Sequence, residues 1–327
     1  MGIDERLVSI LIPAFGRKAM TVCAVECSLA TGAGEVIVSL DTDRECIEEA
    51  LREKRDQRLK VVVQEKQLGL WPNHLALLRT ATRPYIKFLQ TDDLILPGGL
   101  RRLCNEMTPQ TSIVSGLPYY LDRSKGVAWR VEAGTQPGRW TSSEYLSRAA
   151  VAGNELGRPS YTLVRRQCVP IEERYWCDDI SADWLMNLAA AGLGEVAIVP
   201  HGTVVCGVHP GQEGGTQSFH LTTRRLAKTL QTLATFPDSR YRPVISVQAG
   251  AAFATIARNA IGTFLRGRLP FGGGVLQDIV QLTRLIDRSL LATTDGLQAF
   301  LRAIVSRHMR ARRIPVPDPL LPPDSSA

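Results

Sequence analysis

The sequence lacks the cysteine and histidine patterns that would assign it at once to a disulfide or zinc class. Its seven cysteines are scattered, odd in number and contain no Cys-x-x-Cys pair. This pattern favours reduced thiols that fill the core over a disulfide framework. The five histidines include no pair at the spacing of zinc ligands, so no zinc site is expected.

Long apolar runs are also missing, and the first residues do not lead us to expect a secretory signal. No window of eighteen residues is apolar and uncharged throughout, so no membrane-spanning helix is expected. Residues 1–6 are polar and acidic, unlike a secretory signal. We therefore expect a cytoplasmic protein. With 327 residues, the chain is long enough for one large domain with an extension.

Charge is unevenly distributed along the chain. Residues 224–327 hold 15 Lys and Arg against 6 Asp and Glu, a net charge of +9, whereas residues 1–223 have a net charge of −2. Aromatic residues that could stack on bases are sparse in the basic part, which argues against a nucleic-acid partner. Two readings stay open: these helices bind an anionic membrane surface peripherally, or they cover the sheet or form a homodimer contact.

Strands and helices alternate through the first ninety residues. Buried strands are expected at 7–15, 35–40, 59–64 and 85–89, with helices at 17–31, 44–57 and 72–82 between them. This order builds a mostly parallel, Rossmann-like sheet with helices on both faces. The predicted fold class is therefore α/β.

The remaining elements divide the chain into an α/β part and a helical part. Helices are expected at 97–107, 142–152 and 179–191, and strands at 112–117, 127–131, 161–165, 196–199 and 203–208. Only helices follow, at 221–234, 244–266, 275–291 and 297–312. We predict a domain at 1–220 with two halves, at 6–110 and 111–220. An all-helical C-terminal extension at 221–313 and a disordered tail at 314–327 complete the prediction.

Carboxylates follow two of the predicted strands. Asp41 and Asp43 end one strand, and Asp92 with Asp93 ends the strand at 85–89. The carboxyl ends of parallel strands are where open α/β sheets bind ligands. Adjacent carboxylates repel unless a cation neutralises them, and Mg²⁺ and Mn²⁺ combine carboxylates with substrate phosphates. The sequence predicts a metal–diphosphate site here, and the alternative is a solvated pair capping the next helix.

In order and spacing, these motifs resemble those of the family 2 glycosyltransferases, inverting enzymes of the GT-A fold. The matching runs are LVSILIPAF at 7–15, EVIVSLDTD at 35–43 and QLGLWPNHLALLRTATRPYIKFLQTDD at 67–93. The resemblance covers about residues 6–218, and it implies a nucleotide-binding half at 6–110 and an acceptor half at 111–220. It implies transfer of a sugar from a nucleoside-diphosphate sugar, with a UDP-sugar favoured, to a glycan or lipid-linked acceptor. It also implies Mn²⁺ or Mg²⁺ as cofactor and a role in polysaccharide assembly, in the cytoplasm or peripherally at the inner face of the membrane.

The resemblance assigns donor-side roles to particular residues. The implied nucleotide-sugar contacts are Pro13, Ala14, Phe15, Arg17, Asp41, Asp43, Gly69, Asn73, Gln90 and Asp92. Asp93 and His209 would bind the metal, and His209 lies in a loop that would close over the diphosphate. For His209 the alternative is a structural role in that loop. For Asp43 the alternative is a helix cap. Three positions depart from the family pattern: Gln90 replaces an Asp, Gln67 an Asn, and Gly207 an Arg.

The resemblance also implies an acceptor side. Asn154, Pro159 and Ser160 would lie in the acceptor loop, which could instead be an ordinary connection. Inverting transfer needs a general base near the acceptor hydroxyl. Asp183 is favoured because Ala182-Asp-Trp184 before an apolar helix resembles the family's base motif, and Asp179 and Asp178 remain alternatives. A third reading is that these acids only stabilise the helix N-terminus.

Two other functions are compatible with such a sheet. A sugar-phosphate nucleotidyltransferase should carry a Gly-rich loop bearing Arg and Lys after the first strand, but Ala14-Phe-Gly-Arg17 has one Gly. A catalytically inactive nucleotide-sugar or glycan-binding protein would bind nucleotide without turnover.

Overall fold

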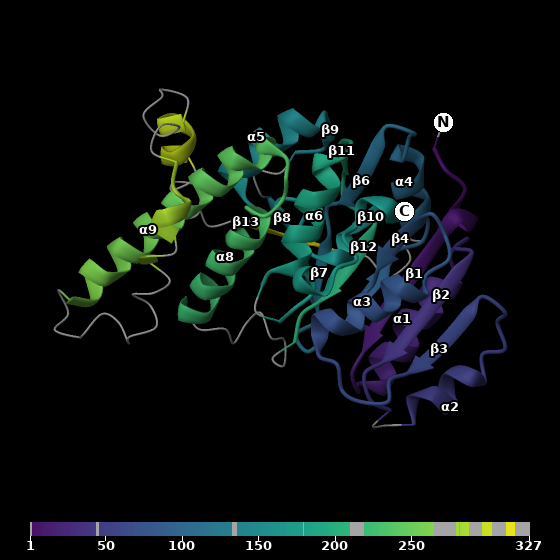
Figure 1. Ribbon diagram of the computed structural model, residues 1–327. Coiled ribbons are helices and arrows are strands. Elements are labelled where there is room, and N and C mark those ends of the chain that lie inside the picture. Colours follow the sequence, from purple (N-terminus) through teal and green to yellow (C-terminus); the bar gives the residue numbers. More distant parts are fainter. Residues whose placement is uncertain are drawn as a thin grey trace.

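A mostly parallel central sheet organises the protein (Figure 1). The computed structural model describes residues 2–43, 46–132, 136–178, 180–209, 219–264, 279–280, 282–287, 296–302 and 312–317. Its strands are β1 Val8–Ala14, β2 Glu35–Leu40, β3 Leu59–Val63, β4 Tyr85–Phe88, β6 Thr111–Gly116, β9 Gly138–Trp140, β10 Thr162–Arg165 and β11 Glu195–Val199, in the order β3-β2-β1-β4-β10-β6-β11-β9. The first four in this order are parallel, whereas β10 is antiparallel to both of its neighbours. The predicted α/β class is confirmed.

Both faces of the central sheet are buried, because its strands are apolar on both sides. Leu11 and Ile37 enter one core, while their neighbours Ile10 and Val36 enter the other. One core is closed by α1 Lys18–Leu29, α2 Ile47–Arg52 and α4 Gly99–Glu106. The opposite core is closed by α3 Leu70–Thr80, α5 Ser142–Ala152 and α6 Ala182–Gly192. Continuous apolar runs such as VSILIPA are typical of strands covered on both faces.

A second, smaller sheet lies beside the carboxyl end of β4. It consists of β13 Arg312–Val316, β8 Val127–Glu132, β7 Tyr119–Asp122, β12 Val204–Gly207 and β5 Asp93–Ile95, in that order. The sequence predicted β8 and β12 but missed β5 and β7. Strands of three and four residues are too short to show a period-two pattern.

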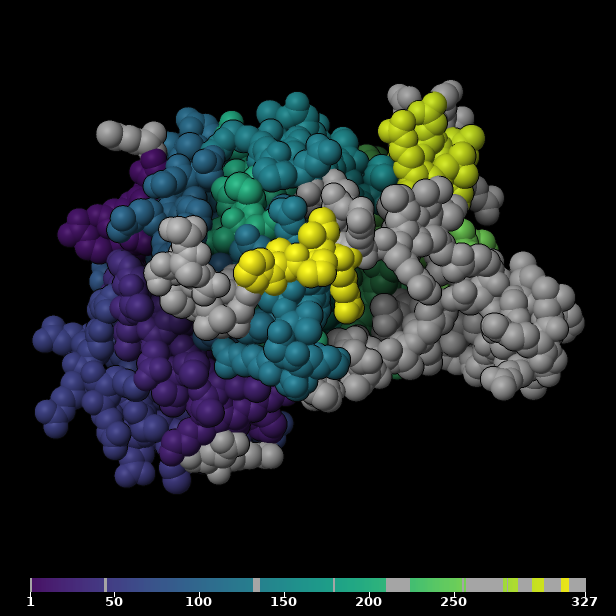
Figure 2. Space-filling view, turned by 180° about the vertical axis from the view of Figure 1, so that it is seen from behind, coloured from purple at the N-terminus to yellow at the C-terminus, as the bar shows by residue number. Residues whose placement is uncertain are grey.

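The strand β13 corrects the prediction of a helix to residue 312 and a disordered tail from 314. It pairs antiparallel with β8 at the edge of the second sheet, and lies as a yellow strip on the surface in Figure 2. The guanidinium of Arg313 packs 4.9 Å from the centre of the Trp129 ring. Pro315 is tolerated because an edge strand can omit a ladder hydrogen bond.

The described C-terminal helices pack on the α/β core. They are α8 Phe219–Leu233 and α9 Arg242–Phe264, joined by the 3₁₀ turn η5 Ser239–Tyr241. Leu230, Val244 and Ala251 share the core of α5 and α6, and α9 extends along α5 (Figure 1). The helices expected at 275–291 and 297–312 fall largely outside the described residues. No described helix is both long and apolar enough to cross a bilayer.

Two predicted helices begin later than expected. The helix expected at 44–57 is the shorter α2, because Asp43 Oδ1 accepts a hydrogen bond from the Ile47 N–H at 2.6 Å. The helix expected from residue 179 begins at Ala182, after Ser181. Asp179 itself lies outside the described residues.

Candidate functional site

The carboxyl ends of β1 and β2 lie side by side. The Asp41 N–H donates to the Ala14 carbonyl at 2.8 Å, so the pairing continues to the strand ends. Pro13 and Ala14 are buried in β1, whereas the Phe15 side chain is 44% exposed. Arg17, at the N-cap of α1, is exposed and has a φ of 57°. At this edge, Phe15 and Arg17 are the implied nucleotide contacts that reach the surface.

Asp41 holds the turn that precedes α3. It is buried, and its two carboxylate oxygens accept from the Leu68 N–H at 2.5 Å and the Gly69 N–H at 3.1 Å. Gly69 has a φ of 95°, and a Cβ there would lie 2.7 Å from Asp178 Oδ2. Asp178 Oδ1 also accepts from the Trp71 N–H at 3.2 Å. Asp178 therefore anchors the first turn of α3, which makes it a poor candidate for the general base.

Two other implied nucleotide contacts stabilise the fold. Asp43 is bonded to the start of α2, as its alternative reading required. Asn73 is buried and exchanges hydrogen bonds with Ser39 on β2: Ser39 Oγ donates to Asn73 Oδ1 at 2.5 Å, and Asn73 Nδ2 donates to the Ser39 carbonyl at 3.2 Å. These contacts connect α3 to the sheet.

Gln90 is positioned by a buried histidine. His74 Nδ1 lies 2.7 Å from the Leu70 carbonyl, which can only accept, so the proton is on Nδ1. His74 Nε2 then accepts from Gln90 Nε2 at 2.8 Å. Burial lowers the pKa of His74 to about 4, which keeps the ring neutral. Gln90 therefore stays fixed just before the acidic pair.

Asp92 lies beside His209, whose loop follows β12. Asp92 Oδ2 is 3.4 Å from His209 Nε2, and Arg17 Nη1 is 3.3 Å from the same nitrogen. The Gly207 N–H donates to the Asp92 carbonyl at 3.1 Å. A Cβ on Gly207 would overlap that carbonyl oxygen, so only glycine permits this approach. This contact gives a physical reason for Gly207 where the family often has Arg.

Asp93, the metal ligand that the resemblance implies, is buried. It begins β5, opposite Cys206 of β12, and its side chain is 0% exposed. No described residue forms a hydrogen bond with either carboxylate oxygen. Burial, and then the charge of Asp92, raise the pKa of Asp93 to about 7. A buried carboxyl is poorly placed to share a metal with a substrate, whereas Asp92 is better placed.

Asp92 and His209 fit a divalent cation by their donor atoms. A carboxylate oxygen and an imidazole nitrogen are both ligands that Mn²⁺ accepts. No group of three or more His, Cys, Asp or Glu side chains gathers at a metal-binding geometry within the part of the chain that the structure describes. A cation here would therefore take further ligands from substrate oxygens or water.

The acceptor-side residues form a connected network at the start of α6. Asn154 Nδ2 lies 3.4 Å from Asp183 Oδ2 and donates to the Gly157 carbonyl at 3.3 Å. Asn187 Nδ2 donates to Asn154 Oδ1 at 3.1 Å and to the same carbonyl at 2.9 Å. Burial raises the pKa of Asp183, although the backbone N–H groups of Trp184 and Asp183 act in the opposite direction. The structure thus brings Asn154 and Asp183 together.

The acceptor segment is also connected to the donor-side strand. Ser160 is buried; its Oγ accepts from the Gln90 N–H at 3.0 Å, and its carbonyl accepts from Lys87 Nζ at 2.5 Å. Pro159 is buried in the 3₁₀ turn η2 Pro159–Tyr161. Burial lowers the pKa of Lys87 to about 8. Sequence reasoning missed Lys87, but a lysine inside the buried run YIKFL was a signal for it.

Asn187 and Arg158 were missed as well. Asn187 is an amide within an otherwise apolar helix, which is a visible sequence signal. Arg158 stands in a loop, and sequence alone could not distinguish it from the many other arginines of the chain.

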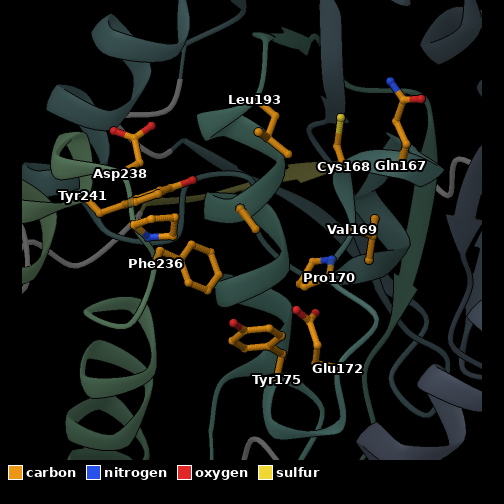
Figure 3. A pocket seen from close by; sticks show the side chains of 12 residues that line it. Gln167, Cys168, Val169, Pro170, Glu172, Tyr175, Leu193, Phe236, Asp238 and Tyr241 are labelled. Carbon is orange, nitrogen blue, oxygen red and sulfur yellow. The ribbon is translucent and has the colours of Figure 1, made fainter.

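A cavity of about 280 Å³ lies elsewhere, between the end of α6, residues 167–175 and the α8–η5 connection (Figure 3). Tyr175 and Tyr241 each pack edge-on against Phe236, with ring centres 5.3 Å apart. None of the implied substrate contacts lines it. It is a packing junction between the α/β core and the C-terminal helices.

Comparison with known families agrees with this geometry. Residues 9–164 match the family model described as glycosyl transferase family 2. This match over residues 9–164 confirms the resemblance to family 2 glycosyltransferases that was predicted from the sequence. No curated protein matches the sequence.

Solved structures of TarS from S. aureus share the fold. TarS 1–349 in complex with UDP-GlcNAc has a TM-score of 0.63 at 11% identity, covering 92% of this chain and 91% of that chain. The same fragment in complex with UDP has a TM-score of 0.57 at 13% identity, with coverages of 92% and 90%. A longer TarS structure has a TM-score of 0.52 at 13% identity, covering 91% of this chain but 55% of that chain. At these identities the likeness establishes the fold.

Proposed function

We propose that the chain is an inverting glycosyltransferase that moves a sugar from a nucleoside-diphosphate sugar to an acceptor hydroxyl. The observation that carries this proposal is the pairing of Asp183 with Asn154, on a segment hydrogen-bonded through Ser160 to the strand end that bears Asp92. The family match supports the reaction class. Because TarS was crystallised with UDP-GlcNAc and UDP, a UDP-sugar is the first donor to test.

Asp183 is the proposed general base. Its raised pKa makes the carboxylate a stronger proton acceptor than an exposed Asp, and Asn154 orients one of its oxygens. The carboxylate takes the proton of the acceptor hydroxyl as the oxygen attacks the anomeric carbon. The bond from that carbon to the diphosphate breaks in the same step, which inverts the configuration.

Asp92 and His209 are the proposed holders of Mn²⁺ or Mg²⁺. A bound cation there would neutralise charge on the departing diphosphate. Arg17 Nη1, 3.3 Å from His209 Nε2, would have to move off that nitrogen for a cation to bind there, and its positive charge would then face the diphosphate. Phe15 offers an exposed ring beside this edge for the base of the nucleotide. Gln90, fixed by His74, offers its amide oxygen to a sugar or ribose hydroxyl.

We further propose that the acceptor is a glycan or lipid-linked molecule, and that the basic C-terminal part brings the protein to the cytoplasmic membrane surface. We keep the domain boundary at residue 220 as a proposal about function only. It does not separate two hydrophobic cores, because α8 and α9 share a core with α5 and α6.

The test is a calorimetric titration of the full chain with UDP, GDP and ADP, each with and without Mn²⁺, followed by turnover of the matching nucleotide sugars. Metal-assisted binding of one diphosphate and release of that diphosphate in a transfer assay are expected. Binding without turnover would instead identify an inactive nucleotide-sugar-binding protein. Absence of binding to any diphosphate would overturn the proposal.

A further inference from the structure

Arg158 lies on the segment that connects the acceptor-side network to the donor-side strand end of the candidate site. The residue before it, Gly157, accepts hydrogen bonds from Asn154 and Asn187, next to Asp183. Two residues after it, Ser160 accepts from the Gln90 N–H, next to Asp92. The backbone on both sides of Arg158 is therefore fixed, one side to the acceptor network and the other to the donor-side strand end.

The Arg158 guanidinium has polar neighbours but no direct partner among the described residues. It is half-buried, and it forms no hydrogen bond or ion pair with any residue in the described ranges. Burial raises the pKa values of Asp93, Tyr161 and Asp183, and the positive charge of Arg158 acts against that rise at all three. The Asp93 carboxyl forms no hydrogen bond with a described residue and so does not pair with it.

An arginine in this position has a clear chemical preference. A half-buried charge without a partner is costly, and the five N–H donors of a guanidinium match phosphate oxygens in a two-pronged geometry. Nearby arginines differ: Arg165 donates to the carbonyls of Thr108, Pro109 and Thr111, and Arg148 pairs with Glu155. Among these three arginines, Arg158 has its donors available.

We propose that Arg158 binds a phosphate group of a substrate. This inference rests on the proposed glycosyl transfer and adds an anion-binding residue on the acceptor loop. The phosphate comes from one of two sources: the diphosphate of the donor, or a phosphate carried by the acceptor. In either case, the anionic substrate would bind directly to the acceptor loop.

The experiment compares the full-length protein with Arg158→Gln and Arg158→Lys. Calorimetry with UDP and UMP in the presence of Mn²⁺ forms the donor arm. Titration of the UDP-saturated protein with glycerol 3-phosphate, with glycerol as the uncharged control, forms the acceptor arm. Arg123→Gln is the matched control, because it removes the same charge at an exposed turn between β7 and β8. Thermal unfolding checks that each variant is folded.

Loss of a hydrogen-bonded charge pair should weaken binding roughly 10- to 100-fold in Arg158→Gln. If the donor supplies the phosphate, Arg158→Gln should bind UDP more weakly than the unmodified protein does, whereas its affinity for UMP should not change. If the acceptor supplies it, glycerol 3-phosphate loses affinity while UDP does not. Arg158→Lys keeps the charge without the two-pronged geometry, so an intermediate loss is expected, and it carries the test if the Gln variant does not fold.

Unchanged affinity in both arms, with the variants folded, would overturn the role of Arg158. That result is distinguishable from failure of the proposed function, in which the unmodified protein would itself bind no nucleoside diphosphate.

Discussion

The donor-side strand ends and the acceptor-side segment use their polar residues differently. On the donor side, Asp41, Asp43 and Asn73 are each bonded to nearby backbone groups of the protein. On the acceptor side, Asn154 and Asp183 lie against each other at the first turn of α6. Position at a strand end therefore does not by itself identify a substrate contact. A strand-end side chain can contact substrate only if its polar atoms are not already hydrogen-bonded to the protein backbone.

Asp92 and Asp93 show the same contrast between adjacent residues. Asp93, the first residue of β5, is fully buried, whereas Asp92, in the turn before the strand, lies beside His209. The metal assignment made for Asp93 from the sequence therefore passes, as a proposal, to Asp92.

The largest effect is expected for Asp183→Asn. The amide keeps the shape and the contact with Asn154 but cannot take a proton, so turnover should fall by about 10²–10⁴-fold. Binding of UDP should persist. Transfer assays and calorimetry on the same preparation measure both quantities. Full turnover in this variant would remove Asp183 as the base and leave Asp179 as the candidate.

The pH profile sharpens this assignment. A general base works only when ionised, so turnover falls as pH falls through the pKa of Asp183. Because burial raises that pKa, the acid limb of kcat should lie above the ordinary range of an Asp. In Asp183→Asn, the residual rate should lack this limb. An acid limb at the same pH in the variant would assign it to another group.

The next effect distinguishes the two adjacent aspartates. Asp92→Ala and His209→Ala should remove the metal-dependent gain in UDP affinity, a loss of at least about tenfold. Asp93→Asn should keep that gain, because its carboxyl is buried away from the edge. Titrations with and without Mn²⁺ measure the difference. A metal effect that disappears in Asp93→Asn and survives in Asp92→Ala would restore the original assignment.

Gly207→Ala tests the approach of β12 to Asp92. The added Cβ would overlap the Asp92 carbonyl, so a stability loss of about 1–3 kcal/mol is expected from overpacking. Gly126→Ala is the control, since it has a positive φ but no atom within 4 Å of the added carbon. Urea unfolding of both variants separates overlap from backbone strain. Equal losses in the two would show that the close approach is not what requires glycine at position 207.

The fold was predictable where periodicity is strong, and the site only in part. Long apolar strands such as β1 and β2 indicate a sheet that is buried on both faces. The order and spacing of the motifs indicated the resemblance to family 2 glycosyltransferases, which the family model matches. The short strand β5 carries no such signal, so the direction of the Asp93 side chain could not be predicted. The role of Asp178 at α3 depends on a contact between residues 107 positions apart, which no local pattern encodes.

The smallest effect concerns the basic C-terminal part, with +9 for residues 224–327. Each Lys or Arg near an anionic lipid surface contributes about 1 kcal/mol, and screening by salt weakens this attraction. Full-length protein should therefore co-sediment with anionic but not neutral vesicles, less so as NaCl rises.

Truncation would remove buried core residues of α8 and α9, so the sharper variant is Arg284→Gln with Arg302→Gln, both exposed. Arg123→Gln with Arg130→Gln, exposed on the β7–β8 hairpin, is the matched control. Equal binding by both double variants would favour a packing or homodimer role for the arginines.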